Sequence, residues 1–296
     1  MNAYRIRPLA AAEGHTAESG FAVEGFTGTQ PQALGRVRVA EQIGVATPRF
    51  WFYVGHVAYR ADDLPLSRHD RVLFLGNDYA GARELLQLQM DPGAPAAALE
   101  ALLHGTLALL QALPEEAQHP LASRTIVELP GLQHGAHSPF WDGLCARFYA
   151  HALPPRGAPE RARHEAAVAS LLPRQPVVVS LLDQAAQDAI GAIDAGHAQV
   201  AAALARCGFR RGLHVNTCDG GPVFEAQPPA HGVAMTLAGI ADTQATERWL
   251  LVPEGVREAW ILPARRGESG LGLGSDHAAL AGLAAGDRCL AIHLST

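Results

Sequence analysis

The sequence predicts a mixed α/β (α+β) protein in which helices flank a sheet. Two short apolar runs, residues 72–75 and 85–90, surround a polar, glycine-containing turn at residues 76–81. Apolar residues at helical spacing follow at once in residues 96–113. Beyond residue 225, short apolar runs separated by Gly, Pro and Asp predict a region that is mostly β.

The elements before this stretch are predicted to be strands. Alternating side chains indicate a first strand in residues 1–8, and residues 21–23 and 36–45 indicate two more. A turn rich in Gly, Thr, Gln and Pro, residues 25–35, is expected between the last two. Residues 49–59 are rich in aromatic side chains and are interpreted as a strand or an ordered loop.

Helices and strands alternate in the second half of the chain. Strands are expected at residues 124–129, 177–182 and 213–217, and helices at residues 139–149, 160–172, 183–190 and 197–207.

The chain is predicted to divide into three regions. Residues 154–159 are rich in Pro and Gly and are interpreted as a linker. The predicted helices near residues 140–149 and 200–209 both have a Phe at or near an end, which leaves open a tandem half-repeat or chance similarity. We therefore expect boundaries at 1–153, 154–226 and 227–296, with the last region small and β-rich.

The composition favours a globular protein and excludes several function classes. Hydrophobic residues make up 48% of the 296 residues, the mean hydropathy is +0.05, and apolar runs break before about 18 residues, so no membrane span is expected. The net charge is −6 without a basic stripe, which argues against nucleic acid as the main partner. All 23 basic residues are Arg, and the absence of Lys excludes Schiff-base chemistry and a Walker-type phosphate lysine.

The first twenty residues and the cysteines suggest a cytoplasmic protein. Residues 1–20 lack the basic start and apolar run of a secretory signal. The four cysteines show no CxxC spacing and are interpreted as free thiols with mostly structural roles.

Three separated motifs carry a resemblance to a known family. They are LFLGNDYAGARELLQLQMDP at residues 73–92, SPFW at 138–141 running on to Arg147-Phe148, and a third group made of QAAQDAIG at 184–191, CGF at 207–209 and DGGP at 219–222. In order and approximate spacing, residues 36–226 resemble the arginine N-succinyltransferase family, whose fold is similar to that of the GNAT acyltransferases. The resemblance implies a GNAT-like mixed sheet flanked by helices. It also implies succinyl-CoA as a co-substrate that is not covalently bound, and the α-amino group of arginine, ornithine or a related amine as acceptor.

The resemblance also indicates where the acyl donor would lie. In GNAT-like folds the pantetheine arm follows a splayed central strand, which corresponds here to residues 85–90. Leu88 stands at the position that contacts succinyl-CoA in the family, with Gln89 and Met90 beside it as further cofactor-binding candidates. A purely structural role in the core is the alternative for Leu88.

The catalytic candidates are Asp194 and His197. An attacking amine must lose a proton, so a group that titrates near neutrality should lie close to the thioester. Asp194 occupies the position of the family's proposed catalytic His, and a carboxyl with an intrinsic pKa of about 3.9 suits that role poorly without burial. His197 follows three residues later and would substitute if the loop bends; a solvent-facing His is the alternative.

Three residues are candidates for binding the acceptor. Asn77 and Asp78 belong to the first shared motif, and Glu128 is an acidic strand residue that could bind a cationic acceptor or serve as a structural hydrogen-bond acceptor. In the position of the family's basic, glycine-containing pyrophosphate turn, this chain has Gly93-Ala94-Pro95.

Two further motifs receive structural interpretations. His134 and His137, with His151, lie near one another in the sequence but lack a carboxylate at helical spacing, so no metal site is expected. The segment 219–222 is interpreted as a tight turn that requires positive φ.

Two function classes remain open. The first is a succinyl-CoA-dependent N-acyltransferase of arginine catabolism, a homo- or hetero-oligomer whose partners are a small-molecule amine and an acyl-CoA rather than nucleic acid or membrane. The second is a non-catalytic homologue or regulatory subunit of a heteromeric succinyltransferase that has lost the CoA turn and the catalytic His.

Overall fold

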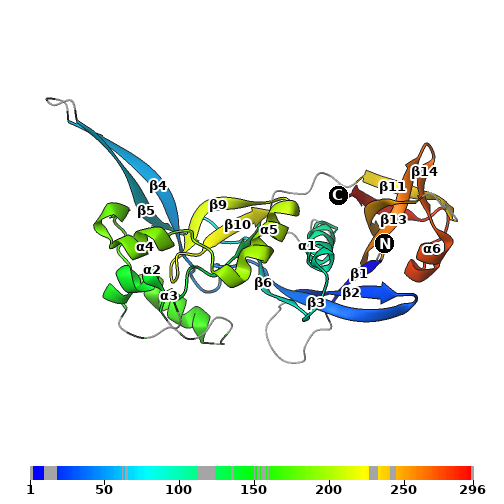
Figure 1. Cartoon of the computed structure of the whole chain (residues 1–296), viewed down its shortest axis with the longest axis horizontal. Helices are drawn as coiled ribbons and strands as arrows, with labels where there is room; N and C mark the ends of the chain where they lie inside the picture. Colours follow the sequence, from blue (N-terminus) through cyan, green and yellow to red (C-terminus); the bar gives the residue numbers. More distant parts are fainter. Residues whose placement is uncertain are drawn as a thin grey trace.

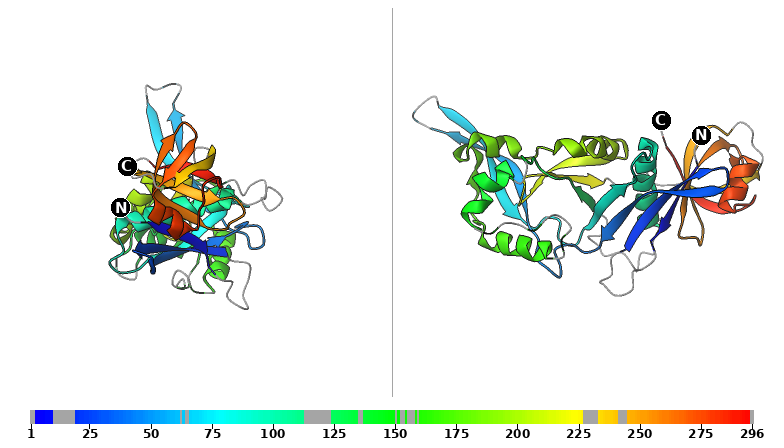
Figure 2. Two further views of the ribbon diagram at one scale, coloured as in Figure 1. Left: turned by 90° about the vertical axis from the view of Figure 1, so that its right-hand side faces the viewer. Right: turned by 60° about the horizontal axis from the view of Figure 1, so that its bottom comes forward.

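The structure, a computed structural model, describes residues 3–294 apart from 10–18, 62, 64–65, 113–123, 135–136, 150, 152–153, 155–157, 159, 227–232 and 241–244. The described chain is elongated, with a β-barrel at one end and a projecting β-ribbon at the other (Figures 1 and 2). Within these residues, no helix is long and apolar enough to cross a membrane. The predicted linker at 154–159 falls mostly outside the described residues.

The fifteen described strands form one continuous sheet in the order β12-β15-β11-β14-β13-β1-β2-β3-β6-β7-β10-β9-β4-β5-β8. The first eight are β1 Tyr4–Pro8, β2 Ser19–Thr27, β3 Gln30–Ala40, β4 Trp51–Arg60, β5 Ser67–Gly76, β6 Arg83–Met90, β7 Thr125–Glu128 and β8 Val177–Val178. The others are β9 Phe209–Asn216, β10 Pro222–Ala226, β11 Val233–Ile240, β12 Glu247–Pro253, β13 Ala259–Gly267, β14 Gly270–Leu273 and β15 Arg288–His293. β6 and β7 pair in parallel, as do β11 and β14.

Six helices are described: α1 Ala96–Gln111, α2 Pro139–Gly143, α3 Arg161–Leu171, α4 Gln184–Ala189, α5 Ala198–Arg206 and α6 Ser275–Ala281. In the middle of the molecule α1 lies between the barrel, which carries α6, and helices α2 to α5, and α2, α3 and α4 lie near the base of the ribbon formed by β4 and β5 (Figure 1).

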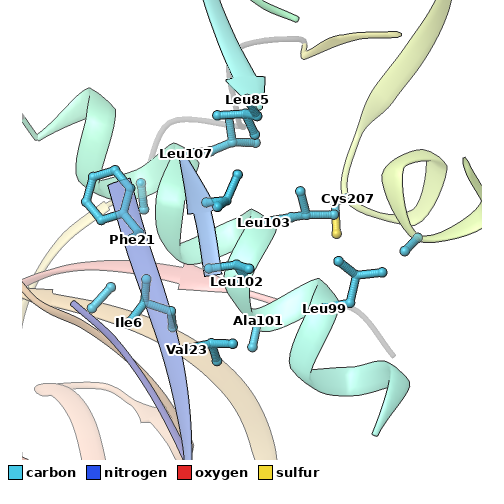
Figure 3. Close-up of a cluster of buried hydrophobic side chains, with 14 of the residues drawn as sticks. Ile6, Phe21, Val23, Leu85, Leu99, Ala101, Leu102, Leu103, Leu107 and Cys207 are labelled. Carbon is cyan, nitrogen blue, oxygen red and sulfur yellow. The ribbon is translucent and has the colours of Figure 1, made fainter. Parts of the chain in front are cut away.

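The largest apolar core surrounds α1. The helix has neither a side-chain cap nor an acidic residue in its first turn, so burial of its apolar faces must stabilise it. Its Leu99, Ala101, Leu102, Leu103 and Leu107 are buried with Ile6, Phe21, Val23, Leu85 and Cys207 (Figure 3). α1 therefore ties the first two strands to the central strand β6.

The carboxy-terminal region closes into a barrel. Strands β12, β15, β11, β14 and β13 follow one another in the sheet, and β12 also pairs with β13. Trp249 and Trp260 belong to the buried core inside this ring. β1 joins the barrel to the rest of the sheet, because Tyr4 lies opposite Ile261 of β13 on one side and Gly25 of β2 on the other.

The structure confirms the prediction of a mixed α/β fold, and strands predominate after residue 226. β4 and β5, from the predicted first region (residues 1–153), share the sheet with β9 and β8 from residues 154–226. The division into three regions and the half-repeat stay predictions.

Several element predictions were wrong in extent. The segment 25–35 is a tight hairpin rather than a long turn, because Gly28 takes φ 63° and lets β3 begin at Gln30, so the strand predicted at 36–45 starts earlier and ends at Ala40. The helix predicted at 139–149 stops at Gly143, since Leu144 leaves helical backbone geometry and a 3₁₀ turn follows. The strand predicted at 177–182 shortens to two residues, since β5 pairs with it only at those residues.

Candidate functional site

Two neighbouring parallel strands, β6 and β7, pair only at their first residues. The register joins Arg83 to Thr125 and Glu84 to Ile126. β6 continues alongside β3 for the rest of its length, and β7 stays paired with β10 through Glu128. The described strands therefore separate beyond Glu84, which is the splayed arrangement that the resemblance implies.

β6 also carries an irregularity where it leaves β7. Gln87 has φ 48°, a left-handed backbone that is uncommon outside glycine. On the other edge Arg38 pairs with Leu86 and Arg36 with Gln89, so β6 has one residue more than β3 between these pairs. Such a β-bulge bends a strand and redirects its side chains, and bulges are common beside active sites.

Two of the three cofactor candidates line an apolar surface. Leu88 and Met90 are half-buried and pack against the α1 core. Ile193, from the loop before α5, and Val200, from α5 itself, pack against the same core. A strand, a loop and a helix thus each contribute apolar side chains to the edge of this one core.

The third candidate, Gln89, is exposed and lies beside arginines that the sequence analysis missed. Its side-chain oxygen accepts a hydrogen bond from Arg36 Nε at 2.9 Å, and Gln87 accepts one from Arg38 at 3.4 Å. Both arginines are on β3, which pairs with β6, whereas the turn at Gly93-Ala94-Pro95 that follows β6 has no basic residue. The alternation of Arg36 and Arg38 with Val37 in a predicted strand was the signal that could have found them.

The structure brings the two catalytic candidates together. The backbone N–H of Asp194 donates to Pro130 O at 3.0 Å, which fixes the loop to the end of β7. Asp194 Oδ2 accepts from the N–H of Gly196 at 3.1 Å and lies 3.4 Å from His197 Nδ1. The imidazole is partly exposed, with 41% of its side-chain surface accessible. With its Nδ1–H directed at the carboxylate, Nε2 is the atom that remains to take a proton.

The Asp194–His197 pair is anchored just beyond the end of β7. Pro130 is the residue whose carbonyl holds Asp194. Leu88 thus lies on β6, and the Asp194–His197 pair is attached to the segment that follows β7.

Glu128, an acceptor candidate, is held by groups within the protein. Its side chain is 2% exposed and accepts hydrogen bonds from Trp51 Nε1 and, at 2.6 Å, from Asn216 Nδ2. Arg49 NH2 lies 2.8 Å from the same carboxylate and also binds Glu84. Trp51, Asn216 and Arg49 thus hold this carboxylate. Glu128 therefore has the role of structural hydrogen-bond acceptor, which was the alternative to binding the acceptor.

The charges of this cluster shift the pKa values of Arg49 and Glu84. Burial opposes the charge of Arg49, but Glu128 and Glu84 outweigh it and raise the pKa of the guanidinium. Burial raises the pKa of Glu84 to about 7; Arg49 opposes this shift, and the charge of Glu128 adds to it.

Asp78 begins a second polar chain that the sequence analysis did not predict. His214 Nε2 lies 3.1 Å from Asp78 Oδ2, and its Nδ1 lies 3.0 Å from the hydroxyl of Tyr79. Tyr79 in turn donates to Glu225, and burial together with this hydrogen bond raises the pKa of the phenol. Asn77, the other candidate in this turn, is exposed.

The two polar groups meet along β9. His214 and Asn216 are two residues apart on this strand and therefore face the same side of the sheet. His214 contacts Asp78, and Asn216 donates a hydrogen bond to Glu128, so both polar groups have a partner on that side of β9. The period-2 spacing of polar residues in a predicted strand was the available signal for this arrangement.

The remaining motifs have structural roles. His134 and His137 pair with each other through their backbones, and the described residues contain no group of three or more His, Cys, Asp or Glu placed to hold a metal ion. Gly220 has φ 68° and the N–H of Gly221 donates to Asp219 Oδ1 at 3.0 Å, so the tight-turn prediction is confirmed.

Comparison with known proteins places these features in a family. Residues 15–230 match the family described as arginine N-succinyltransferase beta subunit. An arginine N-succinyltransferase from Shigella flexneri serotype 5b is 29% identical over 201 residues, which cover 67% of this chain and 56% of the relative. One from Escherichia coli O139:H28 is 28% identical over the same shares. The chain thus spans about half the length of the curated relatives it matches.

A solved structure shares the fold. It is the arginine/ornithine succinyltransferase subunit AI from Pseudomonas aeruginosa, which matches with a TM-score of 0.67 at 17% identity over 96% of this chain and 84% of the other. The likeness extends over the barrel as well as the central sheet, and the family match covers well over half of the sequence. The chain belongs to the arginine N-succinyltransferase beta subunit family.

Proposed function

We propose that the protein transfers a succinyl group from succinyl-CoA to the α-amino group of arginine or a related amine. The observation that carries the proposal is the divergence of β6 and β7, with Leu88 on β6 and the Asp194–His197 pair anchored just beyond the end of β7. Family membership supports the reaction class. The names of the curated relatives support arginine as the acceptor and a place in arginine catabolism.

In this proposal the acyl donor lies along β6. The thioester arm contacts Leu88 and Met90, and backbone N–H groups on the unpaired edge of β6 stabilise the oxygen on which negative charge develops. Gln89 and the neighbouring Arg36 and Arg38 supply the polar and cationic contacts that the turn at 93–95 lacks. Guanidinium groups bind phosphate oxygens well.

His197 acts as the general base. Its Nε2 takes a proton from the acceptor ammonium, the free amine attacks the thioester carbonyl, and the carbon–sulfur bond breaks as the amide forms. The imidazolium of His197 then gives its proton to the departing thiolate of CoA, and the second amine proton leaves to solvent. Asp194 positions the imidazole and stabilises its charged form.

The acceptor approaches from the polar side of β9. Asp78 and Asn77 at the turn before β6 are proposed to bind its cationic end. Glu128 holds the side chains of Trp51 and Asn216 in place beside this site. We further propose that the protein works in the cytoplasm as an oligomer, either with itself or with a related subunit. The description of the family as a beta subunit supports this arrangement.

A non-catalytic or regulatory subunit is the second candidate. It is favoured by the turn at Gly93-Ala94-Pro95, which has no basic side chain, and by Asp194 at the position of the family's proposed catalytic His. Both candidate functions predict the same fold. They differ in whether the protein binds succinyl-CoA and turns it over.

The test is an assay of CoA thiol release from succinyl-CoA with arginine or ornithine, together with calorimetry of CoA binding. We expect turnover in the native protein, a loss of at least about 100-fold in kcat for His197→Ala, and a smaller loss for Asp194→Asn. His69→Ala, an exposed histidine on β5, is the matched control and should retain activity.

The outcomes separate the candidates. Absence of CoA binding at millimolar ligand, or full turnover in His197→Ala, would overturn the catalytic proposal. Copurification of an inactive protein with a longer homologue that gains activity from it would establish the regulatory role instead.

A further inference from the structure

A cavity of about 540 Å³ lies where the barrel meets the rest of the molecule. It is lined by the ends of β1 and β2, the last turn of α1, the start of β11, the turn between β12 and β13, and the start of β15. Its size falls within the range of about 300–1,000 Å³ that small-molecule sites occupy, and boundaries between structural units are common places for such sites.

The inner wall of the cavity is apolar and preformed. Phe21, Leu109, Leu110, Val252 and Cys289 are among its lining residues, and each is buried. They come from the α1 core and from the barrel, so the wall is held by two packed clusters. A site of this kind binds an apolar body without rearrangement.

The rim of the cavity is charged, and positive charge is in excess. Arg257, Arg288 and Glu254 line it, and all three are exposed. Arg288 lies 3.7 Å from Glu254, whereas Arg257 has no ion pair within the described residues. One guanidinium is therefore left to bind an anion.

The orientation of α1 determines where that anion would lie. Leu109, Leu110 and Ala112 bring the carboxyl end of the helix to the inner wall, and this end carries partial negative charge. An anionic group is disfavoured there and favoured at the arginine rim. A bound molecule would place its apolar body inward and its charge outward.

We propose that this cavity binds a small molecule with an apolar body and one anionic group, such as a medium-chain or aromatic carboxylate. The site is separate from the one proposed for acyl transfer: none of its lining residues belongs to that site. α1 is 16 residues long, so its two ends stand about 24 Å apart, one following β6 and the other lining the cavity.

The test uses octanoate as the probe, with 1-octanol and octylamine as matched neutral and cationic controls, measured by calorimetry on the full chain. Octanoate should bind in a one-to-one ratio and more tightly than either control. Arg257→Gln and Arg288→Gln should each weaken octanoate binding about fivefold and leave 1-octanol within about twofold, since a partly exposed charge contact contributes about 1 kcal/mol.

A second variant tests the place of binding. Ala234 is exposed on β11 and lines the cavity, so Ala234→Trp should obstruct it and abolish octanoate binding. Ala279→Trp, at an exposed position on α6 outside the lining, is the control for adding the same side chain to the barrel.

Each alternative result counts against the proposal. Preference for octylamine would reverse the assigned charge, and unchanged binding in Ala234→Trp would place the probe elsewhere. Displacement of octanoate by CoA would show that the cavity belongs to the acyl-transfer site. Failure of acyl transfer alone leaves these binding measurements intact, so the two proposals stand or fall separately.

Discussion

The indole ring of Trp51 meets the phenol ring of Tyr79 edge-on, with 5.2 Å between the ring centroids. The polar atom of each ring donates to a different carboxylate, Trp51 to Glu128 and Tyr79 to Glu225. One aromatic contact therefore joins the buried cluster around Arg49 to the polar chain that reaches Asp78. The two polar groups share one support, and a change in one ring should affect both.

Trp51→Phe should destabilise the fold by about 1–3 kcal/mol or more, because a smaller ring replaces a fully buried indole and Glu128 loses a buried donor. Urea denaturation measures the change. Trp141→Phe removes the same N–H from a half-buried ring and should cost less. Equal costs for the two variants would contradict a special role for the Trp51–Glu128 hydrogen bond.

Glu84→Gln should change how stability depends on pH. Because burial raises the pKa of Glu84 to about 7 in the folded protein, the folded state retains a proton that the unfolded state has already released. The free energy of unfolding must then fall as the pH rises from the unfolded pKa towards 7. The stability of the native protein relative to Glu84→Gln should decline by about 1–3 kcal/mol across this interval.

Denaturation curves at successive pH values measure this difference. Glu268→Gln removes a carboxylate from an exposed turn and supplies the baseline for losing one negative charge. A difference that grows with pH would mean that the Glu84 pKa is lowered rather than raised.

The four cysteines should be nearly unreactive towards thiol reagents in the folded protein. All are buried, and burial raises the pKa of Cys207 and Cys218 to about 12 and that of Cys289 to about 11; the pKa of Cys145 is raised as well. The thiolate is the reactive form, so little is present at about pH 8. An aromatic disulfide reagent should count four thiols only after denaturation, and rapid reaction of any one in native protein would contradict the burial.

Gly221→Ala should destabilise the protein by more than about 3 kcal/mol, because a Cβ there would lie 2.2 Å from the carbonyl oxygen of Leu129 and 2.5 Å from the N of Gly131. Backbone atoms cannot move aside as a flexible side chain can. Gly28→Ala has open space around it and only a positive φ to accommodate, so a cost of about 1 kcal/mol is expected. Thermal unfolding of both variants gives the comparison, and similar costs would contradict the steric argument.

Local pattern was sufficient to predict most of the helices and strands. Helix α1 was predicted within two residues, because its leucines repeat at helical spacing and Pro95 marks its start. The prediction of a helix at 139–149 is wrong from Leu144 onward, where tertiary packing of the following turn overrides a continuous apolar pattern. The order of strands, and the barrel that they close, depend on pairings between distant segments that no local pattern records.

The site was predictable to the extent that each residue's partners are close in sequence. Asp194 and His197 are three residues apart, and one bent loop brings them together. Tyr79, by contrast, meets His214 and Glu225 only because β9 and β10 return beside the turn before β6. Glu128 could be recognised as an acidic strand residue, but Arg49, which occupies its carboxylate, lies on a distant loop.

The position of β1 has a consequence for how the protein is made. Its two neighbours in the sheet are β2, synthesised soon after it, and β13, which begins at Ala259 and is synthesised much later. Contacts between such distant segments form slowly, and domains begin to fold while the chain is still being translated. The outer edge of β1 must therefore wait, unpaired, until the ribosome has released the barrel strands. β13 thus completes the pairing that β1 and β2 began.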